Sequence, residues 1–287
     1  MLLIQNAHIK TMVGPDLERG DILVENGKIS AVAPHIDAPA GARVLDAQGR
    51  LLTPGCVDAH CHIGLDNQAM RWEGWDYNES ADPLTPQLRG IDSINPQDEA
   101  FSLALQGGVT TACTGPGSAN VVGGTFSVIK LAGNRVDDMI LKDPAAMKCA
   151  FGENPKGVYG QGKSRSPITR MGVASLLREL LFKTRRYMED KAAGKNPAYD
   201  MKLEAMIPVV EGRLPLKCHA HRADDILTAV RIAKEFDLKI TLDHCTDGAL
   251  IADELAKEDY PVFVGPSFGS KTKVELKNKS FATAGIL

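Results

Sequence analysis

The stretch that decides the fold is Leu52-Thr-Pro-Gly-Cys-Val-Asp-Ala-His-Cys-His62. In it, an apolar run enters a Pro-Gly turn and continues as a short β-prone segment that ends in His60-x-His62. Side chains alternate between the two faces of a strand, so His60 and His62 point the same way. Two imidazoles aimed at one point suit a metal ion. Because two histidines often lie this close by chance, a metal site needs further ligands and a fold that gathers them.

The composition is that of an ordinary globular protein. The 287 residues are 44% hydrophobic and 24% charged, with a net charge of −3. This near-neutral balance predicts neither nucleic acid nor a membrane as a partner, and no apolar run is long enough for a transmembrane helix. The N-terminus lacks the pattern of a signal peptide. The six cysteines include no CxxC pair, so we expect reduced thiols in a cytoplasmic protein.

The first 53 residues predict a small β module. An Asn26-Gly27 turn separates two β-prone runs, which is a strong local signal for a hairpin. Further β-prone runs lie on both sides of this hairpin. We therefore expect the N-terminal part of a β-sandwich over residues 1–53, ahead of a main domain over residues 54–287.

The main domain alternates β-prone runs with helical patterns, most clearly in its last third. Short connections between alternating strands and helices predict βα units and a parallel sheet. The candidate strands that follow the opening motif lie at 109–114, 125–131, 146–151, 214–221, 238–245 and 260–265. A TIM-type (β/α)8 barrel has eight strands in about 250 residues. We therefore expect an α/β barrel of this kind, with seven strands present and the eighth missing after Leu287.

Five of the seven histidines lie in three blocks at the predicted ends of strands. These blocks are His60 and His62, His219 and His221, and His244. In a parallel barrel, all strands open with their carboxyl ends on one face, where active sites lie. The three blocks can therefore converge, although more than 150 residues separate the first from the second. The cysteines next to them, by alternation, point away from the site.

The chemistry expected of such a site is hydrolysis. A divalent metal held mainly by imidazoles lowers the pKa of a bound water and polarises a carbonyl group. A carboxylate must then carry the proton from the water to the leaving nitrogen. The sequence offers no obvious residue for this role. Asp58 lies on the ligand face but deeper in the barrel, and Asp243, next to His244, should face outward by strand alternation.

Two loops lie between these elements. Residues 64–95 form a long acidic segment that contains both tryptophans, which suits a lid, a substrate wall, a subunit contact or a merely structural excursion. Residues 115–124 are rich in glycine. They could offer backbone N–H groups to an anionic substrate group or serve as a plain turn-rich connection.

Together these features resemble the amidohydrolase superfamily, and in particular its imidazolonepropionase-related branch. The motifs that carry the resemblance are Asn26-Gly-Lys-Ile29, Pro54-Gly-Cys-Val-Asp-Ala-His-Cys-His62, Gly108-Val-Thr-Thr111, His219-Ala-His-Arg-Ala-Asp224 and Asp243-His244. The resemblance covers essentially the whole chain. It implies a (β/α)8 barrel with a β-sandwich built from both ends of the chain.

The resemblance also implies roles for the histidines. His60 and His62 would be metal ligands from the first strand, and His219 the metal ligand from the fifth. His244 would be the sixth-strand histidine, a catalytic group that acts as a ligand or binds substrate. His221 shares a strand face with His219 and is a candidate for substrate binding.

The fourth strand leaves the number of metal ions open. Binuclear members of the superfamily carry a bridging lysine there, and some members use a glutamate. Lys148 and Glu153 are both available, and Glu153, at the end of its strand, is the better placed as a metal ligand. We expect one or two divalent ions, with zinc first and iron or manganese as alternatives.

The chain departs from the superfamily's pattern at its C-terminal end, where the acid of the eighth strand and the strands that complete the β-sandwich are both absent. The aspartate that the superfamily places at the end of the eighth strand, a metal ligand and proton carrier, would lie beyond Leu287. We therefore expect a C-terminally incomplete chain, or a protein that lacks this acid.

The functional prediction is a metal-dependent hydrolase that cleaves an amide-type C–N bond, other than a peptide bond between protein residues, in a cyclic amide or a small N-acyl or peptide-like substrate. The alternative is an inactive or truncated amidohydrolase-like fragment. The expected partners are a small-molecule substrate and further copies of the chain in a homo-oligomer.

Overall fold

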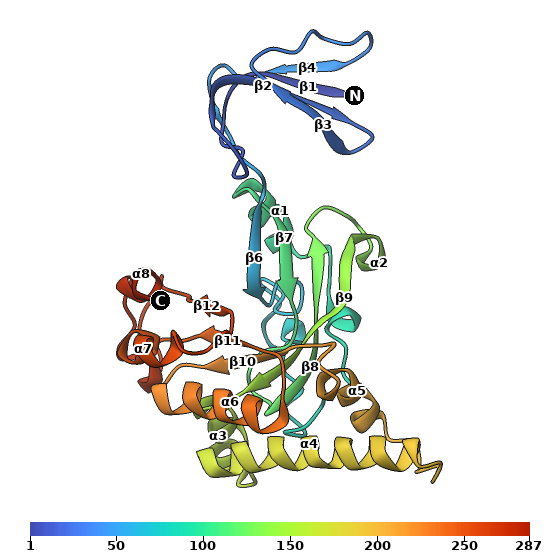
Figure 1. Ribbon diagram of the computed structural model, residues 1–287, viewed down its shortest axis with the longest axis vertical. Coiled ribbons are helices and arrows are strands. Elements are labelled where there is room, and N and C mark those ends of the chain that lie inside the picture. Colours follow the sequence, from blue (N-terminus) through green and yellow to red (C-terminus); the bar gives the residue numbers. More distant parts are fainter. The chain divides into compact units, whose positions relative to one another are not determined.

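A computed structural model describes residues 1–287, and the chain in it forms two compact units, Met1–Cys56 and Val57–Leu287 (Figure 1). Each unit has its own sheet. None of the helices is both long enough and apolar enough to cross a membrane.

The first unit is a five-stranded sheet with the order β3-β2-β1-β4, in which β5 also pairs with β1. Its strands are β1 (Leu2–Ile9), β2 (Leu17–Glu25), β3 (Lys28–Ala33), β4 (Arg43–Asp46) and β5 (Leu51–Leu52). The predicted hairpin joins β2 to β3, since Asn26 and Gly27 have φ angles of 51° and 75°. Two positive φ angles in succession define the type I′ turn that suits the twist of a two-residue hairpin.

A buried carboxylate fixes an irregularity in this sheet. The pairing of β1 with β2 shifts register between Ile4 and Ala7, where Asn6 has a φ of 57°. Asp21, which is buried on β2, accepts hydrogen bonds from the backbone N–H groups of Asn6 and Ile36, both at 2.9 Å. Asp21 thus supplies acceptors to two N–H groups that the strand ladder leaves unpaired.

The second unit is built on a seven-stranded, nearly closed, barrel-shaped sheet with the order β12-β11-β10-β9-β8-β7-β6. Its strands are β6 (Cys56–Cys61), β7 (Val109–Thr114), β8 (Val122–Lys130), β9 (Ile140–Ala150), β10 (Leu216–Ala220), β11 (Ile240–His244) and β12 (Val262–Val264). The strands from β9 to β12 are parallel, which confirms the reading of the last third of the chain.

One strand departs from the parallel pattern. β8 runs antiparallel to both β7 and β9. The connection from Thr114 to Val122 contains no helix, and a parallel strand needs a crossover of a dozen or more residues. The glycine-rich loop is too short for such a crossover, so the chain returns as a hairpin.

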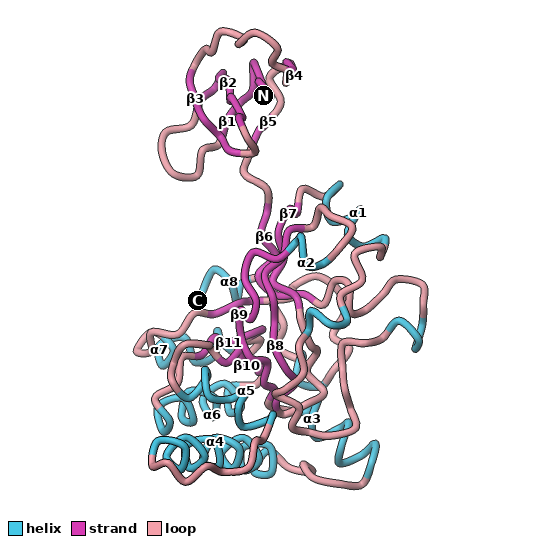
Figure 2. The backbone as a smooth tube through the Cα atoms, turned by 90° about the vertical axis from the view of Figure 1, so that its right-hand side faces the viewer, coloured by secondary structure: helices cyan, strands magenta, loops and turns pink.

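The second unit also contains α-helices. They are α1 (Glu99–Gln106), α2 (Val136–Met139), α3 (Glu153–Lys156), α4 (Arg170–Ala192), α5 (Met201–Val210), α6 (Ala223–Phe236), α7 (Ala252–Leu255) and α8 (Ala282–Ile286). Figure 2 shows α4 and α6 side by side, and α6 packs against β10 and β11. Their apolar faces form one core with the strands, which holds β10 and β11 in place beneath the site.

Candidate functional site

All five predicted histidines line one cavity of about 960 Å³. His60 and His62 come from the end of β6, His219 lies on β10 with His221 just after it, and His244 ends β11. The ring centroid of His244 lies 4.9 Å from that of His60, 4.5 Å from that of His219 and 4.9 Å from that of His221. The ring centroids of His60 and His62 are 5.4 Å apart. The structure therefore brings the three sequence blocks together around His244.

Backbone carbonyl oxygens orient two of the rings, those of His62 and His244. His62 Nδ1 lies 2.7 Å from the carbonyl oxygen of Gly115, and His244 Nδ1 lies 2.6 Å from that of Gly265. A carbonyl oxygen only accepts, so in both rings Nδ1 carries the proton and Nε2 keeps its lone pair. An imidazole held in this way is ready to bind a metal through Nε2.

Burial keeps the imidazoles neutral. It lowers the pKa of His60 and of His62 to about 4, and that of His221 and of His244 to about 3. The pKa of His219 also falls well below its ordinary value, mainly through burial. At neutral pH all five rings are therefore neutral, with one nitrogen of each ring free of a proton, which is the form that binds metal ions.

A carboxylate that the sequence did not predict completes a candidate metal site. Glu275 is 2% exposed, and its Oε1 lies 3.8 Å from the Nε2 atoms of His219 and His221. One ligand atom from each of these three residues lies within 4.8 Å of the other two. Two imidazoles and a carboxylate form a ligand set that suits zinc and related divalent metals.

Unpartnered atoms around the histidines test whether a cation fits. His60 Nε2 and Glu275 Oε1 are buried without a hydrogen-bond partner. Buried polar atoms without partners are rare in folded proteins and call for an explanation. A bound cation would satisfy these lone pairs, so the residues present fit a metal.

The interior of the barrel beneath the histidines holds an unexpected charged cluster. Asp243 is fully buried, with Oδ2 at 3.1 Å from His60 Nδ1 and 3.5 Å from Lys148 Nζ. Its Oδ1 accepts a hydrogen bond of 3.0 Å from Lys217 Nζ. Burial alone would raise the pKa of Asp243, but His60 and the two lysines hold it below its ordinary value.

The prediction that Asp243 faces outward was therefore wrong. Side chains alternate only while the backbone stays extended. Here the backbone turns at the end of β11, where His244 and Cys245 have φ angles of 76° and 44°. Asp243 and His244 can therefore both lie on the site side of the strand.

The two fourth-strand candidates have different surroundings. Lys148 lies on β9, fully buried, and its ammonium group points at Asp243. Glu153 begins α3, and its Oε2 accepts a hydrogen bond of 3.3 Å from the backbone N–H of Glu275. Glu153 is not part of the His219, His221 and Glu275 group. The carboxylate in that group comes from the loop after β12 instead.

Both loops singled out in the sequence contribute to the site. Tyr77, from the long acidic segment, stacks on His62 with ring centroids 5.7 Å apart. Asn78 accepts a hydrogen bond of 3.0 Å from the N–H of Ala119 in the glycine-rich loop. The long segment therefore forms a wall beside His62, while Trp72 is 78% exposed.

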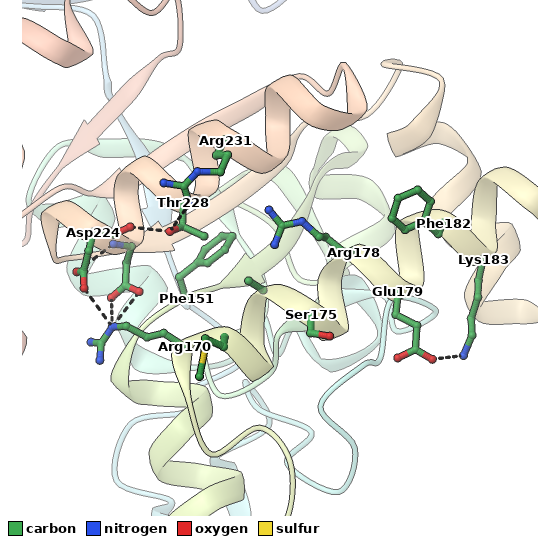
Figure 3. Close-up of a pocket in the computed structure, with 13 residues that line it drawn as sticks. Phe151, Arg170, Ser175, Arg178, Glu179, Phe182, Lys183, Asp224, Thr228 and Arg231 are labelled. Atoms are coloured by element: carbon green, nitrogen blue, oxygen red, sulfur yellow. Dashed lines mark hydrogen bonds and ion pairs between the residues drawn. The ribbon is translucent and has the colours of Figure 1, made fainter.

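A separate cavity of about 780 Å³ lies between α4 and α6, away from the histidines (Figure 3). Its charged groups are mostly paired. Arg170 Nε donates to Asp225 at 3.0 Å, and Lys183 contacts Glu179 at 2.6 Å. With few free polar groups directed into it, this cavity lacks the marks of an active site.

The second unit is thus a barrel-type α/β structure with a buried cluster of histidines and a carboxylate at the ends of its strands. Metal-dependent enzymes of this fold carry their active sites at this place.

Comparison with known proteins specifies the family. A solved amidohydrolase from Thermotoga maritima MSB8 superposes with a TM-score of 0.95 at 43% identity, over 100% of this chain and 75% of that one. The chain belongs to the amidohydrolase superfamily.

Curated relatives agree with this assignment. Amidohydrolase tasK of Hapsidospora irregularis is 33% identical over 263 residues, which cover 82% of this chain and 27% of that protein. An imidazolonepropionase of Klebsiella pneumoniae is 36% identical over 113 residues, or 35% of this chain and 27% of the relative. The chain thus spans about a quarter of the length of these relatives. No family model matches the sequence.

Proposed function

We propose that the chain carries the catalytic centre of a metal-dependent hydrolase that cleaves an amide-type C–N bond in a cyclic amide or a small N-acyl or peptide-like substrate. The observation that carries this proposal is the convergence of five neutral imidazoles and the Glu275 carboxylate on one cavity. The amidohydrolase and imidazolonepropionase names of the relatives support the same reaction class.

The metal would be held by His219, His221 and Glu275. On the other side of His244, the ligands would be His60 and His62. Zinc is the first candidate because imidazole and carboxylate both suit it, and iron or manganese are alternatives. When bound, such an ion makes water a better nucleophile at neutral pH and polarises a carbonyl oxygen. The two separated groups of imidazoles leave room for one or two ions.

The protein's own groups serve this chemistry by orientation and by charge. The carbonyl groups of Gly115 and Gly265 fix the tautomers of His62 and His244. Because both rings are already oriented, they need not reorient during the reaction. Tyr77 covers one face of His62 and limits access of bulk water. The carboxylate of Glu275, whose Oε1 has no hydrogen-bond partner within the chain, could take a proton from water and return it to the leaving nitrogen when Oε1 does not itself hold the metal.

Replacement of a first-strand histidine tests the proposal. His60→Ala is expected to lower metal-dependent turnover by at least about a hundredfold, since even residues that only support a metal ligand account for 10- to 100-fold. The fold should survive, as judged by circular dichroism. The assay is release of amine or ring opening across a panel of cyclic amides and N-acyl amino acids, with and without added zinc.

His35→Ala is the matched control, because His35 lies in the first unit with 72% of its side chain exposed. It should leave turnover unchanged. Full activity of the His60→Ala variant would refute the assignment.

A further inference from the structure

We propose that Asp243 is a positioning residue for the candidate metal site: it holds the ring of His60 in the tautomer that leaves Nε2 free to bind a metal. This inference rests on the proposed function, which it deepens by giving a role to a buried charge that takes no direct part in the reaction.

The two nitrogens of the His60 ring have different surroundings. Nδ1 lies 3.1 Å from Asp243 Oδ2. The oxygens of an ionised aspartate only accept, so Nδ1 carries the proton of the neutral ring. Nε2 is buried and has no hydrogen-bond partner within the chain. It therefore keeps its lone pair, as the binding nitrogen of a metal ligand must.

His60 obtains its acceptor in a different way from the other oriented rings. The Nδ1 atoms of His62 and His244 donate to backbone carbonyl oxygens, whereas His60 depends on a side chain. The strands β6, which carries His60, and β11, which carries Asp243, are not neighbours in the sheet. Asp243 therefore connects them across the interior of the barrel, and a change of this one side chain can release the ring.

Two lysines fix the carboxylate of Asp243. Lys217 Nζ donates to Oδ1 at 3.0 Å, and Lys148 Nζ lies 3.5 Å from Oδ2. Both lysines are buried, and Lys217 Nζ also lies over the ring of Phe263, 3.9 Å from its centroid. A charged carboxylate in the interior of a protein requires such partners. Because Lys217 holds Oδ1, the other oxygen is left for His60.

This arrangement determines what an amide would do in the place of the acid. In Asp243→Asn, one of the two oxygens becomes an NH₂ group. The ammonium group of Lys217 can only donate, so it retains the oxygen and leaves the NH₂ group facing His60 Nδ1. Nδ1 must then accept, and the proton of the ring moves to Nε2. An aspartate that orients an imidazole loses this function as an amide for the same reason.

Nitrogen NMR of the metal-free protein tests the tautomer directly. In protein with nitrogen-15-labelled histidine near neutral pH, the shifts of the two ring nitrogens identify which one carries the proton. The signals of His60 are those that His60→Ala lacks. The wild type should carry the proton on Nδ1, and Asp243→Asn should carry it on Nε2.

A wild type with the proton on Nε2 would overturn the inference, and this spectrum decides even if the variant does not fold. The same tautomer in the wild type and in a folded Asp243→Asn variant would overturn it as well.

Asp58→Asn is the matched control. Asp58 is exposed on β6 and accepts a hydrogen bond of 3.0 Å from the backbone N–H of His60. Its replacement removes the same charge beside the same residue without touching the ring, so the tautomer of His60 should not change. A change of tautomer in Asp58→Asn would count against the inference, because nearby charge and not the hydrogen bond of Asp243 would then set the ring.

Zinc affinity, measured by equilibrium dialysis, gives a second readout. Asp243→Asn should weaken zinc binding by about 10- to 100-fold, the usual effect of removing a group that orients a metal ligand. In the His60→Ala background, the same substitution should weaken it by less than about threefold, because Asp243 acts through His60. An equal loss in both backgrounds would overturn the inference.

This inference and the proposed function can fail separately. The expected tautomers and zinc affinities without turnover of any amide would uphold the role of Asp243 and count against the hydrolase. Amide turnover by a wild type whose His60 carries its proton on Nε2 would uphold the hydrolase and remove the role of Asp243.

Discussion

Glu153 and Glu275 hold one another in place. The backbone N–H of Glu153 donates to Glu275 Oε2 at 3.0 Å, and the backbone N–H of Glu275 donates to Glu153 Oε2 at 3.3 Å. This exchange joins the start of α3 to the loop after β12. Only Glu275 directs its second oxygen at the imidazoles of His219 and His221, so the two carboxylates have separable roles.

Conversion of each acid to its amide distinguishes these roles. Glu275→Gln is expected to weaken zinc binding by about tenfold or more, because a neutral amide is a much poorer ligand than a carboxylate. Glu153→Gln keeps an oxygen that can accept the N–H of Glu275 and should change zinc affinity by less than about threefold. Equilibrium dialysis against zinc measures both. A larger effect of Glu153→Gln would assign the ligand role to that residue instead.

The buried carboxylate of Asp225 depends on its ion pair with Arg170. Arg170 Nε lies 3.0 Å from both carboxylate oxygens of Asp225, whose side chain is 4% exposed. Arg170→Met should lower the free energy of unfolding by about 2–3 kcal/mol, because it leaves Asp225 buried without its cation. The double variant Arg170→Met/Asp225→Asn should recover most of this loss in urea unfolding. Additive losses in the double variant would show that the pair is not coupled.

The sequence predicted the histidines of the site, but it did not predict the positions of the acids Glu275 and Asp243. The histidines lie at strand ends, where strand register and the shared face of a barrel determine their direction. Glu275 lies in a single 3-10 turn, Val274–Leu276, of the lysine-rich segment after β12, where no periodicity of the sequence relates it to the site. Asp243 was placed on the wrong side because strand alternation was applied to a position where the backbone already turns at His244.

The lengths of the connections between strands explain which of the predicted strand directions were right. The segments that join β10, β11 and β12 are long enough for a helix, and these strands are parallel as predicted. The segment between β7 and β8 is too short, which reverses β8. The β-prone runs and turn residues were therefore enough to count the seven strands. The short loop between β7 and β8 was also enough to predict the direction of β8.

The buried carboxylate of Asp21 should stabilise the first unit in a way that depends on pH. Burial raises the pKa of Asp21, but the N–H groups of Asn6 and Ile36 outweigh it and hold the pKa below its ordinary 3.8. The stabilisation from the ionised form is therefore complete above about pH 4 and is lost as the pH falls through the lower, folded-state pKa.

Asp21→Asn should accordingly destabilise the first unit by about 1–2 kcal/mol at pH 7, since the amide keeps an oxygen for one N–H group and presents an NH₂ group, which cannot accept, to the other. The difference from the wild type should shrink as the pH falls through the lowered pKa of Asp21 in the folded protein. Thermal unfolding at several pH values measures it. A difference that does not change with pH would mean that the charge of Asp21 is not what stabilises the β1–β2 irregularity.

At the scale of the molecule, the site joins strands that are far apart in sequence. β6, β10 and β11 each supply a part of it, so a metal bound there stabilises the assembled second unit but not the unfolded chain. Zinc at a hundred times its dissociation constant adds about 2.7 kcal/mol. That corresponds to a rise in Tm of about 5–10 °C for a unit of this size.

This rise should disappear in the double variant His60→Ala/His219→Ala and persist in His35→Ala. Scanning calorimetry with and without zinc checks it. An equal rise in all three proteins would mean that zinc binds outside the histidine cavity.

The metal-to-protein ratio decides whether the histidine cavity holds a divalent metal. After incubation with zinc and dialysis, atomic emission spectroscopy together with intact mass should give about one or two ions per wild-type chain, and well under half an ion per chain in His60→Ala/His219→Ala. A wild-type chain of the expected mass, folded but without bound metal, or a double variant that keeps its full complement, would contradict the account.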